Sequence, residues 1–357
     1  MQVTRLVCKN FRCFDHLDLV FEEPCVLICG RNGVGKTSIL EALYYGCYAR
    51  SFRTAQVKNL LLLNADHFSV AISFTDDRLL SHELRSGFAD NKKLIKIDQR
   101  PVRLYREITD HYRIITVTAD DLSIIQGAPE IRRNFIDHTV FLLEPEYTQL
   151  LHEYHRIVLQ KKSLLKNPKN DFDSYRVWTK KLWEYTKTIQ KKRLNALLCI
   201  KEYTNKLLDH YQIGNTIDFS YKYKEAMADS FEEFSKQLHF WYQREKHFGR
   251  SLFGAHLDDI EILFQAKKTR TLASRGQQKL TIVFLKIALM NKLIETKGKA
   301  IFCIDDFLAD FDDIAIKQLF SIILDLNCQV IITSPNSDLG KKCYVKKKEL
   351  QEIKLTN

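Results

Sequence analysis

Apolar and polar residues follow one rhythm near the two ends of the chain and another in its middle. In the N-terminal part, QVTRLVCKN and LDLVFEE, joined by FRCFDH, alternate as half-exposed strands do, and CVLIC is typical of a buried strand. A glycine-rich loop and an apolar helix at about residues 36–48 follow, and FSVAISFT, LSHELRS and KLIKIDQRPV then favour further strands. Toward the C-terminus, RGQQKLTIVFLKIALMNKLI and DIAIKQLFSIILDL are typical of helices, and AIFCIDD and CQVIITS of buried strands. This alternation predicts an α/β fold on a largely parallel sheet.

The middle of the chain has helical periodicity instead. At residues 146–165 the apolar positions fall near one stripe, which comprises Tyr147, Leu151, Tyr154, Val158 and Leu165. The segment KNPKNDFD then breaks the helix at Pro168. A second helix, of about 30 residues and about 45 Å, carries Trp178, Leu182, Tyr185, Ile189, Ala196, Ile200, Tyr203 and Leu207. We therefore expect an antiparallel helical hairpin inside an insertion at residues 126–245, which divides one α/β domain into residues 1–125 and 246–357.

The charge of the chain adds a possible partner to this picture. The formal net charge is +11 over 357 residues, and residues 151–206 alone hold 14 Lys and Arg against 5 Asp and Glu. Such an excess favours a polyanionic partner, either nucleic acid or an anionic membrane surface. The basic face of the hairpin is therefore either simply solvated or an arm that contacts DNA. Because there is no run of about 18 apolar residues and no secretion signal, we expect a cytoplasmic protein that does not span a membrane.

The segment GRNGVGKT fits the phosphate-loop pattern G-x-x-x-x-G-K-T, with the required strand before it and helix after it. Glycines allow the backbone amides to turn inward around phosphate groups, and the start of the helix adds a positive end. Lys36 can reach the β- and γ-phosphates, and Thr37 can ligate Mg²⁺. The residues expected to bind the nucleotide here are Gly30, Arg31, Asn32, Gly33, Val34, Gly35, Lys36, Thr37 and Ser38.

Two adjacent carboxylates end the predicted strand AIFCIDD. A buried strand would bring Asp305 to the rim of the sheet, where it can hold the Mg²⁺ through water. Asp306 follows on the side where an attacking water could be oriented, which makes it the catalytic partner of Lys36. Paired acids at a strand end are common by chance, but behind a phosphate loop they favour a hydrolytic site.

The segment LASRGQQKL precedes this strand by about 30 residues and opens a helix. The segment could be simply a capped helix start. Its serine, glycine and glutamine also resemble the signature motif of ABC-type ATPases, here Ser274, Arg275, Gly276 and Gln277. In that family the signature of one subunit completes the ATP site of the other. The resemblance therefore implies ATP as the nucleotide and a twofold dimer with two ATP molecules at its interface.

Further segments resemble the RecF family of bacterial recombination mediators over essentially the whole chain. The matching segments are NFR (Asn10–Arg12), SFRT (Ser51–Thr54), GAPEIRRNFID (Gly127–Asp137) and SRGQQK (Ser274–Lys279). Two segments depart from the family: GAHLDD (Gly254–Asp259) stands where the family usually has GPHRDD, and ADFD (Ala309–Asp312) stands where it has SELD. Thr333 occupies the position where many ABC ATPases have a switch histidine, and chains of the RecF family tend to have Thr or Ser there. The retained Asp312 implies a contact across the dimer, and Thr333 is a candidate for the role of the switch residue.

The resemblance implies a fold and a function. The fold would be an ABC-type P-loop ATPase head, similar to Rad50 and SMC heads, with a helical insertion. The family binds ATP and Mg²⁺, with Arg12 joining the nucleotide-binding residues, and forms an ATP-dependent homodimer that clamps duplex, single-strand or gapped DNA. Slow, DNA-stimulated hydrolysis would reset the clamp. RecO- and RecR-type mediators would be its partners when RecA replaces single-strand binding protein in recombinational repair.

Three other functions are compatible with a phosphate loop in this setting. An SMC or Rad50 head would carry very long coiled coils, for which the insertion is too short. The nucleotide-binding subunit of a transporter would bind a membrane partner, and the basic insertion disfavours it. A binding module in which ATP is only structural would lack a nucleotide-dependent change in DNA affinity.

Overall fold

The computed structural model describes residues 1–76, 78–103, 105–109, 111–167, 171–214, 216–223, 229–307, 311–335 and 350–356. The chain forms two compact units, which we call unit 1 (Met1–Leu122 with Arg275–Asn357) and unit 2 (Ser123–Ser274). The expected insertion at residues 126–245 lies within unit 2. Residues 246–274, which we expected in the C-terminal ATPase part, also belong to unit 2, because β10 (Asp259–Phe264) pairs with β9 (Ile217–Lys222) there.

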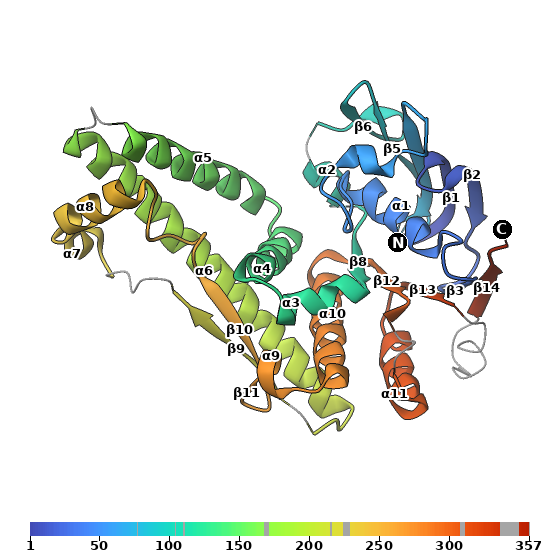
Figure 1. Cartoon of the computed structure of the whole chain (residues 1–357). Helices are drawn as coiled ribbons and strands as arrows, with labels where there is room; N and C mark the ends of the chain where they lie inside the picture. Colours follow the sequence, from blue (N-terminus) through green and yellow to red (C-terminus); the bar gives the residue numbers. More distant parts are fainter. Residues whose placement is uncertain are drawn as a thin grey trace. The chain divides into compact units, whose positions relative to one another are not determined.

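Unit 1 contains the predicted parallel sheet, with the strand order β14-β3-β13-β12-β8 (Figure 1). Its strands are β3 (Cys25–Cys29), β8 (Ile114–Val117), β12 (Ile301–Asp305), β13 (Gln329–Ser334) and β14 (Leu350–Lys354). All neighbouring strands in this sheet are parallel. The helices α10 (Arg275–Lys297) and α11 (Asp313–Leu324) are the two that the sequence predicts around β12. The α/β fold is therefore confirmed.

A second sheet of unit 1 is antiparallel, with the order β2-β1-β4-β5-β6-β7. Its strands are β1 (Gln2–Phe11), β2 (Phe14–Val20), β4 (Phe68–Thr75), β5 (Ser81–Ala89), β6 (Lys92–Ile97) and β7 (Arg100–Pro101). Helix α1 (Lys36–Tyr48) contacts strands of both sheets. Every residue of α1 except Thr37 is buried, which explains why apolar residues occur on all sides of the helix. Short helices complete this part of unit 1: η1 (Val57–Leu60), α2 (Tyr105–Thr109) and η2 (Ala119–Leu122).

Unit 2 is built around the predicted helical hairpin, α5 (Tyr147–Lys166) and α6 (Phe172–His210) (Figure 1). The expected break at Pro168 lies outside the described residues. Helix α6 has 39 residues, or about 58 Å, and is longer than we expected. It starts earlier than the apolar stripe suggests, because Asp171 caps it by accepting a hydrogen bond from the Ser174 amide at 2.5 Å. The other helices are α3 (Ser123–Gln126), α4 (Pro129–Leu143), α7 (Phe231–Ser235), α8 (Leu238–Phe248) and α9 (Thr269–Leu272).

A small sheet with the order β11-β10-β9 completes unit 2, where β11 is Lys267–Lys268. The buried side of the hairpin packs with α8 and the segment before β10 into one apolar core. Within the described ranges, we find no helix that combines the length and the apolar character needed to cross a membrane.

Candidate nucleotide-binding site

The predicted phosphate loop joins β3 to α1 in unit 1. Gly33 and Gly35 have φ angles of 89° and 102°, in the left-handed region that favours glycine. A Cβ atom on Gly35 would also lie only 2.4 Å from the ring of Phe14 and 2.7 Å from Cys13 Sγ. The loop thus needs glycine at this position both for its backbone angle and for the close approach of β2. Helix α1 begins directly after it, so the helix N-terminus faces the loop.

Lys36 is held inside this loop and is only 4% exposed. Its Nζ atom donates hydrogen bonds to the backbone oxygens of Gly30 at 2.9 Å and Arg31 at 3.2 Å. The same atom lies 3.5 Å from Asp306 Oδ2. A compact ammonium group with three donors suits this position between backbone carbonyls and a carboxylate.

Thr37, Asp305 and Thr333 meet at the carboxyl end of the parallel sheet, where Asp305 of β12 pairs with Thr333 of β13. Thr37 Oγ1 lies 2.9 Å from each Asp305 oxygen, and Thr333 Oγ1 donates to Asp305 Oδ1 at 2.8 Å. Burial raises the pKa of Asp305, and the hydrogen bonds from Thr333 and Thr37 oppose that rise. Hydroxyl and carboxylate oxygens are the hard ligands that Mg²⁺ prefers, so these residues fit the expected metal.

Asp306 has a strained backbone and an incompletely bonded side chain. Its φ angle is 47°, and its amide donates to Thr333 Oγ1 at 2.9 Å. Thr333, which the sequence offered as a candidate, therefore forms hydrogen bonds with both aspartates. Asp306 Oδ1 is buried, and no donor from the described part of the chain reaches it. A carboxylate oxygen with unused capacity beside Lys36 is compatible with the expected role of orienting water.

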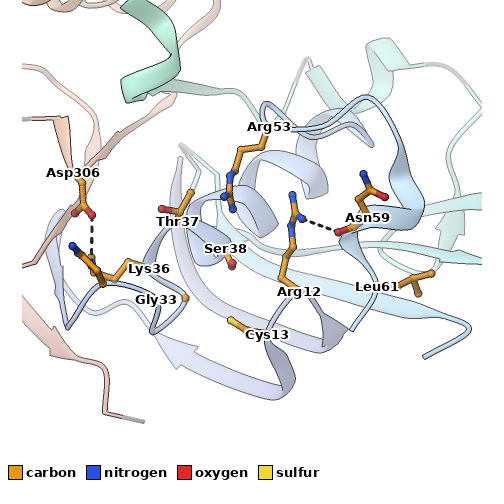
Figure 2. A pocket seen from close by; sticks show the side chains of 12 residues that line it. Arg12, Cys13, Gly33, Lys36, Thr37, Ser38, Arg53, Asn59, Leu61 and Asp306 are labelled. Carbon is orange, nitrogen blue, oxygen red and sulfur yellow. Dashed lines mark hydrogen bonds and ion pairs between the residues drawn. The ribbon is translucent and has the colours of Figure 1, made fainter. Parts of the chain in front are cut away.

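Lys36, Thr37 and Asp306 line one pocket of about 560 Å³, large enough for a nucleotide (Figure 2). Its lining consists of Arg12, Cys13, Asn32, Gly33, Gly35, Lys36, Thr37, Ser38, Arg53, Asn59, Leu61 and Asp306. Figure 2 shows Arg12, Arg53 and Asn59 on the side away from Lys36 and Asp306. The structure thus brings Arg12 to the loop, as expected. Arg53, Asn59, Leu61 and Cys13 were not predicted, although Arg53 lies in the family segment SFRT.

The expected signature residues lie where unit 2 ends and α10 begins. Ser274, Arg275 and Gly276 are exposed, and Gln277 is half-buried. A Cβ atom on Gly276 would meet no atom of this chain within 4 Å, so contacts within the described chain do not require glycine there. Asp312 caps α11, since its Oδ1 accepts a hydrogen bond from the Ala315 amide at 2.8 Å. Ala309 and Asp310 of the ADFD segment lie outside the described residues.

The family segments GAPEIRRNFID and GAHLDD meet within unit 2. Arg132 makes a bidentate pair with Asp259 at 2.8 and 2.9 Å, and Arg133 donates to the Asp258 backbone oxygen at 2.7 Å. The Asp258 carboxylate accepts from Gln190 at 2.7 Å. Both acids of GAHLDD are therefore held by partners inside the unit. These contacts indicate a structural role for the motif, and Leu257 occupies the position of the family's arginine.

Part of the basic excess in the hairpin is not available to a ligand. Lys161 is 0% exposed and paired with Glu245 at 2.7 Å, and Arg193 is buried against Asp137 at 2.7 Å. Other basic side chains of this region have no ion pair with a described residue and are exposed, or half-buried in the case of Lys187: Arg156, Lys162, Lys166, Arg176, Lys180, Lys181, Lys187 and Lys191. A cationic surface remains, but it is smaller than the sequence suggests.

The parallel sheet, the phosphate loop and the two aspartates at the sheet edge define a P-loop ATPase head of the ABC type. Residues 5–297 match the AAA domain family. The chain is 30% identical to the DNA replication and repair protein RecF of Halalkalibacterium halodurans, covering 95% of this chain and 94% of that protein. It is 28% identical to RecF of Bacillus mycoides, covering 90% and 89%. The chain belongs to the RecF family.

Solved structures agree with this assignment. The recombination mediator protein RecF-ATPrS in the RecFOR pathway superimposes with a TM-score of 0.82 at 26% identity, covering 94% of this chain and 93% of that one. The Smc head bound to the C-winged helix domain of ScpA has a TM-score of 0.55 at 15% identity, covering 96% and 92%. The second likeness concerns the fold alone.

Proposed function

We propose that this chain is an ATP-dependent DNA-binding protein of recombinational repair, in which ATP joins two copies into a clamp on DNA. The observation that carries the proposal is the contact between Thr37 and Asp305, which lie 268 residues apart in the sequence. Together with the contact between Lys36 and Asp306, it supports a nucleotide site in which a phosphate loop, a metal-binding acid and a second acid act together. The relatives support the rest, since they are DNA replication and repair proteins and one was solved as RecF-ATPrS.

The proposed chemistry assigns each residue one task. The loop amides and Lys36 bind the β- and γ-phosphates, and Thr37 and Asp305 hold Mg²⁺. The metal supplies charge neutralisation for the phosphates. Asp306 accepts a hydrogen bond from the attacking water, and Thr333 keeps both aspartates in place. Turnover is slow because the other half of each site comes from a second copy.

That second half is the exposed start of α10. We propose that Ser274, Arg275, Gly276 and Gln277 approach the γ-phosphate in the pocket of the other copy, with Asp312 nearby. The dimer then binds duplex, single-strand or gapped DNA, with the exposed lysines and arginines of the hairpin contacting backbone phosphates. DNA stimulates hydrolysis, which resets the clamp. RecO- and RecR-type proteins are the partners, as the RecFOR context of the solved relative suggests.

The test measures assembly and DNA affinity with ATP, with ADP and without nucleotide. Sedimentation gives the oligomeric state, and fluorescence anisotropy gives the affinity for duplex, single-strand and gapped DNA of equal length. We expect dimers and tighter DNA binding with ATP alone. Equal DNA affinity in all three states would contradict the clamp and favour a binding module in which ATP is only structural.

A Ser274→Arg variant tests the second copy's contribution. A bulky cation at the exposed helix start should block dimerisation and hydrolysis together, while the affinity of one chain for ATP survives. DNA binding should lose its dependence on ATP but keep a salt-sensitive basal level. If this variant still dimerises with ATP and hydrolyses it normally, the site is complete within one chain.

A further inference from the structure

Part of the pocket wall is formed by residues outside the phosphate loop. A buried carboxylate, that of Glu41, lies behind this part of the wall. Glu41 of α1 is 0% exposed. Arg12 donates to its two oxygens through Nε and Nη2, both at 2.7 Å. Ser51 Oγ also donates to Glu41, and Arg53 Nη1 lies 3.7 Å from it. One acid thus contacts two guanidinium groups that line the pocket.

The backbone around Glu41 fixes these contacts. Glu41 follows Thr37 by four residues on α1, so both lie on the same face of the helix. Arg12 stands at the end of β1 with a φ angle of 57°, and its Nη1 donates to the Asn59 backbone oxygen at 2.7 Å. Ser51 Oγ accepts hydrogen bonds from the amides of Arg53 at 2.8 Å and Thr54 at 3.0 Å. Glu41 therefore fixes one guanidinium directly and the turn that carries the other.

The charges of this cluster do not cancel. Two guanidinium groups share one carboxylate, so one positive charge remains. The side chains of Arg12 and Arg53 are 21% and 43% exposed, on the pocket side (Figure 2). Among the described residues that line the pocket, Asp306 is the only acid, and it lies beside Lys36. No hydrogen bond joins the Arg53 guanidinium to a described residue, so its donors are available to an anion.

We propose that Glu41 is a positioning residue, which holds Arg12 and Arg53 as a cationic wall against the phosphate chain of the bound nucleotide. The proposal rests on the nucleotide site described under the proposed function. It gives a task to the SFRT segment, for which the sequence alone offers no role. Glu41 does not touch the nucleotide, and its effect passes through the two arginines.

The test is the ATP affinity of a Glu41→Gln variant, measured by calorimetry. Glutamine keeps the size of the side chain but cannot accept two charge-assisted bonds from Arg12, so the wall loses its fixed geometry. We expect ATP to bind about tenfold more weakly. Simple Coulomb attraction predicts the opposite, because removing a negative charge near the pocket would tighten the binding of an anion. Tighter or unchanged binding would therefore overturn the proposal.

Asp121→Asn is the matched control for a general loss of structure. Asp121 also lies in unit 1, where it forms an ion pair with Lys286 at 2.9 Å and accepts a hydrogen bond from the Thr118 amide at 2.8 Å. It does not line the pocket. This variant should lower the melting temperature and leave ATP affinity unchanged. If Glu41→Gln unfolds, the shorter Glu41→Asp takes its place with the same expected direction.

Coupling separates positioning from a merely structural effect. In an Arg12→Gln/Arg53→Gln background, the change at Glu41 should weaken ATP binding by less than about twofold, because the groups through which it acts are gone. The same tenfold loss in both backgrounds would overturn the proposal. Failure of the unaltered chain to bind ATP would overturn the proposed function, and this inference with it.

Discussion

Each unit of the molecule has a carboxylate that is 0% exposed and bonded to a cation, but the two clusters differ in what surrounds them. In unit 2, Glu245 pairs with Lys161, which is also 0% exposed, and accepts hydrogen bonds from Tyr175 at 2.8 Å and Ser251 at 2.9 Å. In unit 1, Glu41 has cationic partners that are partly exposed and line a pocket. The acids have equal burial, and only their partners distinguish the sites.

This difference separates a structural cluster from one that can act on a ligand. Around Glu245 every charge has been removed from water, at a cost that the pair and its hydrogen bonds offset. Burial lowers the pKa of Lys161 to about 8, although Glu245 opposes the shift. Around Glu41 one positive charge remains at the pocket surface. We therefore expect changes in the first cluster to alter folding stability, and changes in the second to alter nucleotide binding.

The largest effect should follow from Lys161→Met, which leaves Glu245 buried without its cation. We expect a loss of about 3–5 kcal/mol in the free energy of unfolding. All three tryptophans, Trp178, Trp183 and Trp241, lie in unit 2, so intrinsic fluorescence during urea unfolding reports on this unit.

The double variant Lys161→Met/Glu245→Leu sharpens this result. Replacing both charges with apolar groups should restore most of the lost stability, because no unpaired charge remains. Neither variant should alter ATP affinity, in contrast to Glu41→Gln. If Lys161→Met is as stable as the original chain, the cluster around Glu245 does not stabilise the fold, and the proposed difference between the two clusters is wrong.

Lys36→Arg should have the next largest effect, on hydrolysis rather than stability. The planar guanidinium is too large for the space where Nζ contacts the oxygens of Gly30 and Arg31. We expect ATP hydrolysis to fall by about 100–1000-fold, while some ATP binding remains. Lys317→Arg, an exposed position on α11, is the matched control and should hydrolyse ATP normally. Normal turnover in Lys36→Arg would contradict the assignment of the loop.

The same contrast explains which parts could be predicted from the sequence. The phosphate loop and the acids at the end of β12 are visible because local backbone geometry dictates their residue types and order. Arg12 was expected at the site only from the family resemblance, and its link through Glu41 to Arg53 was missed because these three residues come together only through tertiary contacts. Lys161 was counted as part of a basic face, since only burial distinguishes a paired lysine from a free one. The pairing of β9 with β10, which joins residues 246–274 to unit 2, leaves no local signal in the sequence.

Asp306→Asn should impair the attack of water after ATP has bound, whereas Lys36→Arg already alters the contact with the phosphates. Asparagine keeps the size of the side chain but is a weaker acceptor for the attacking water, so we expect hydrolysis to be about 100-fold slower. ATP binding should be retained, and ATP-bound dimers should accumulate in sedimentation. Unchanged hydrolysis would mean that another group orients the water.

The smallest expected effect is a pH dependence that arises at Asp305. A carboxylate must be ionised to hold Mg²⁺, and burial raises the pKa of Asp305 above its ordinary value of 3.8. The Mg²⁺-dependent part of ATP affinity should therefore decline a few-fold as the pH falls, at a higher pH than an ordinary aspartate would require.

Protonation of Asp305 does not itself unfold the site. Because the raised pKa belongs to the folded state, proton binding stabilises the fold as the pH falls from that value toward 3.8. Calorimetric titration of ATP with and without Mg²⁺ across this range measures the effect. Asp305→Asn should bind ATP more weakly with Mg²⁺ and lose the pH dependence, and the same pH profile in this variant would assign the titration to another group.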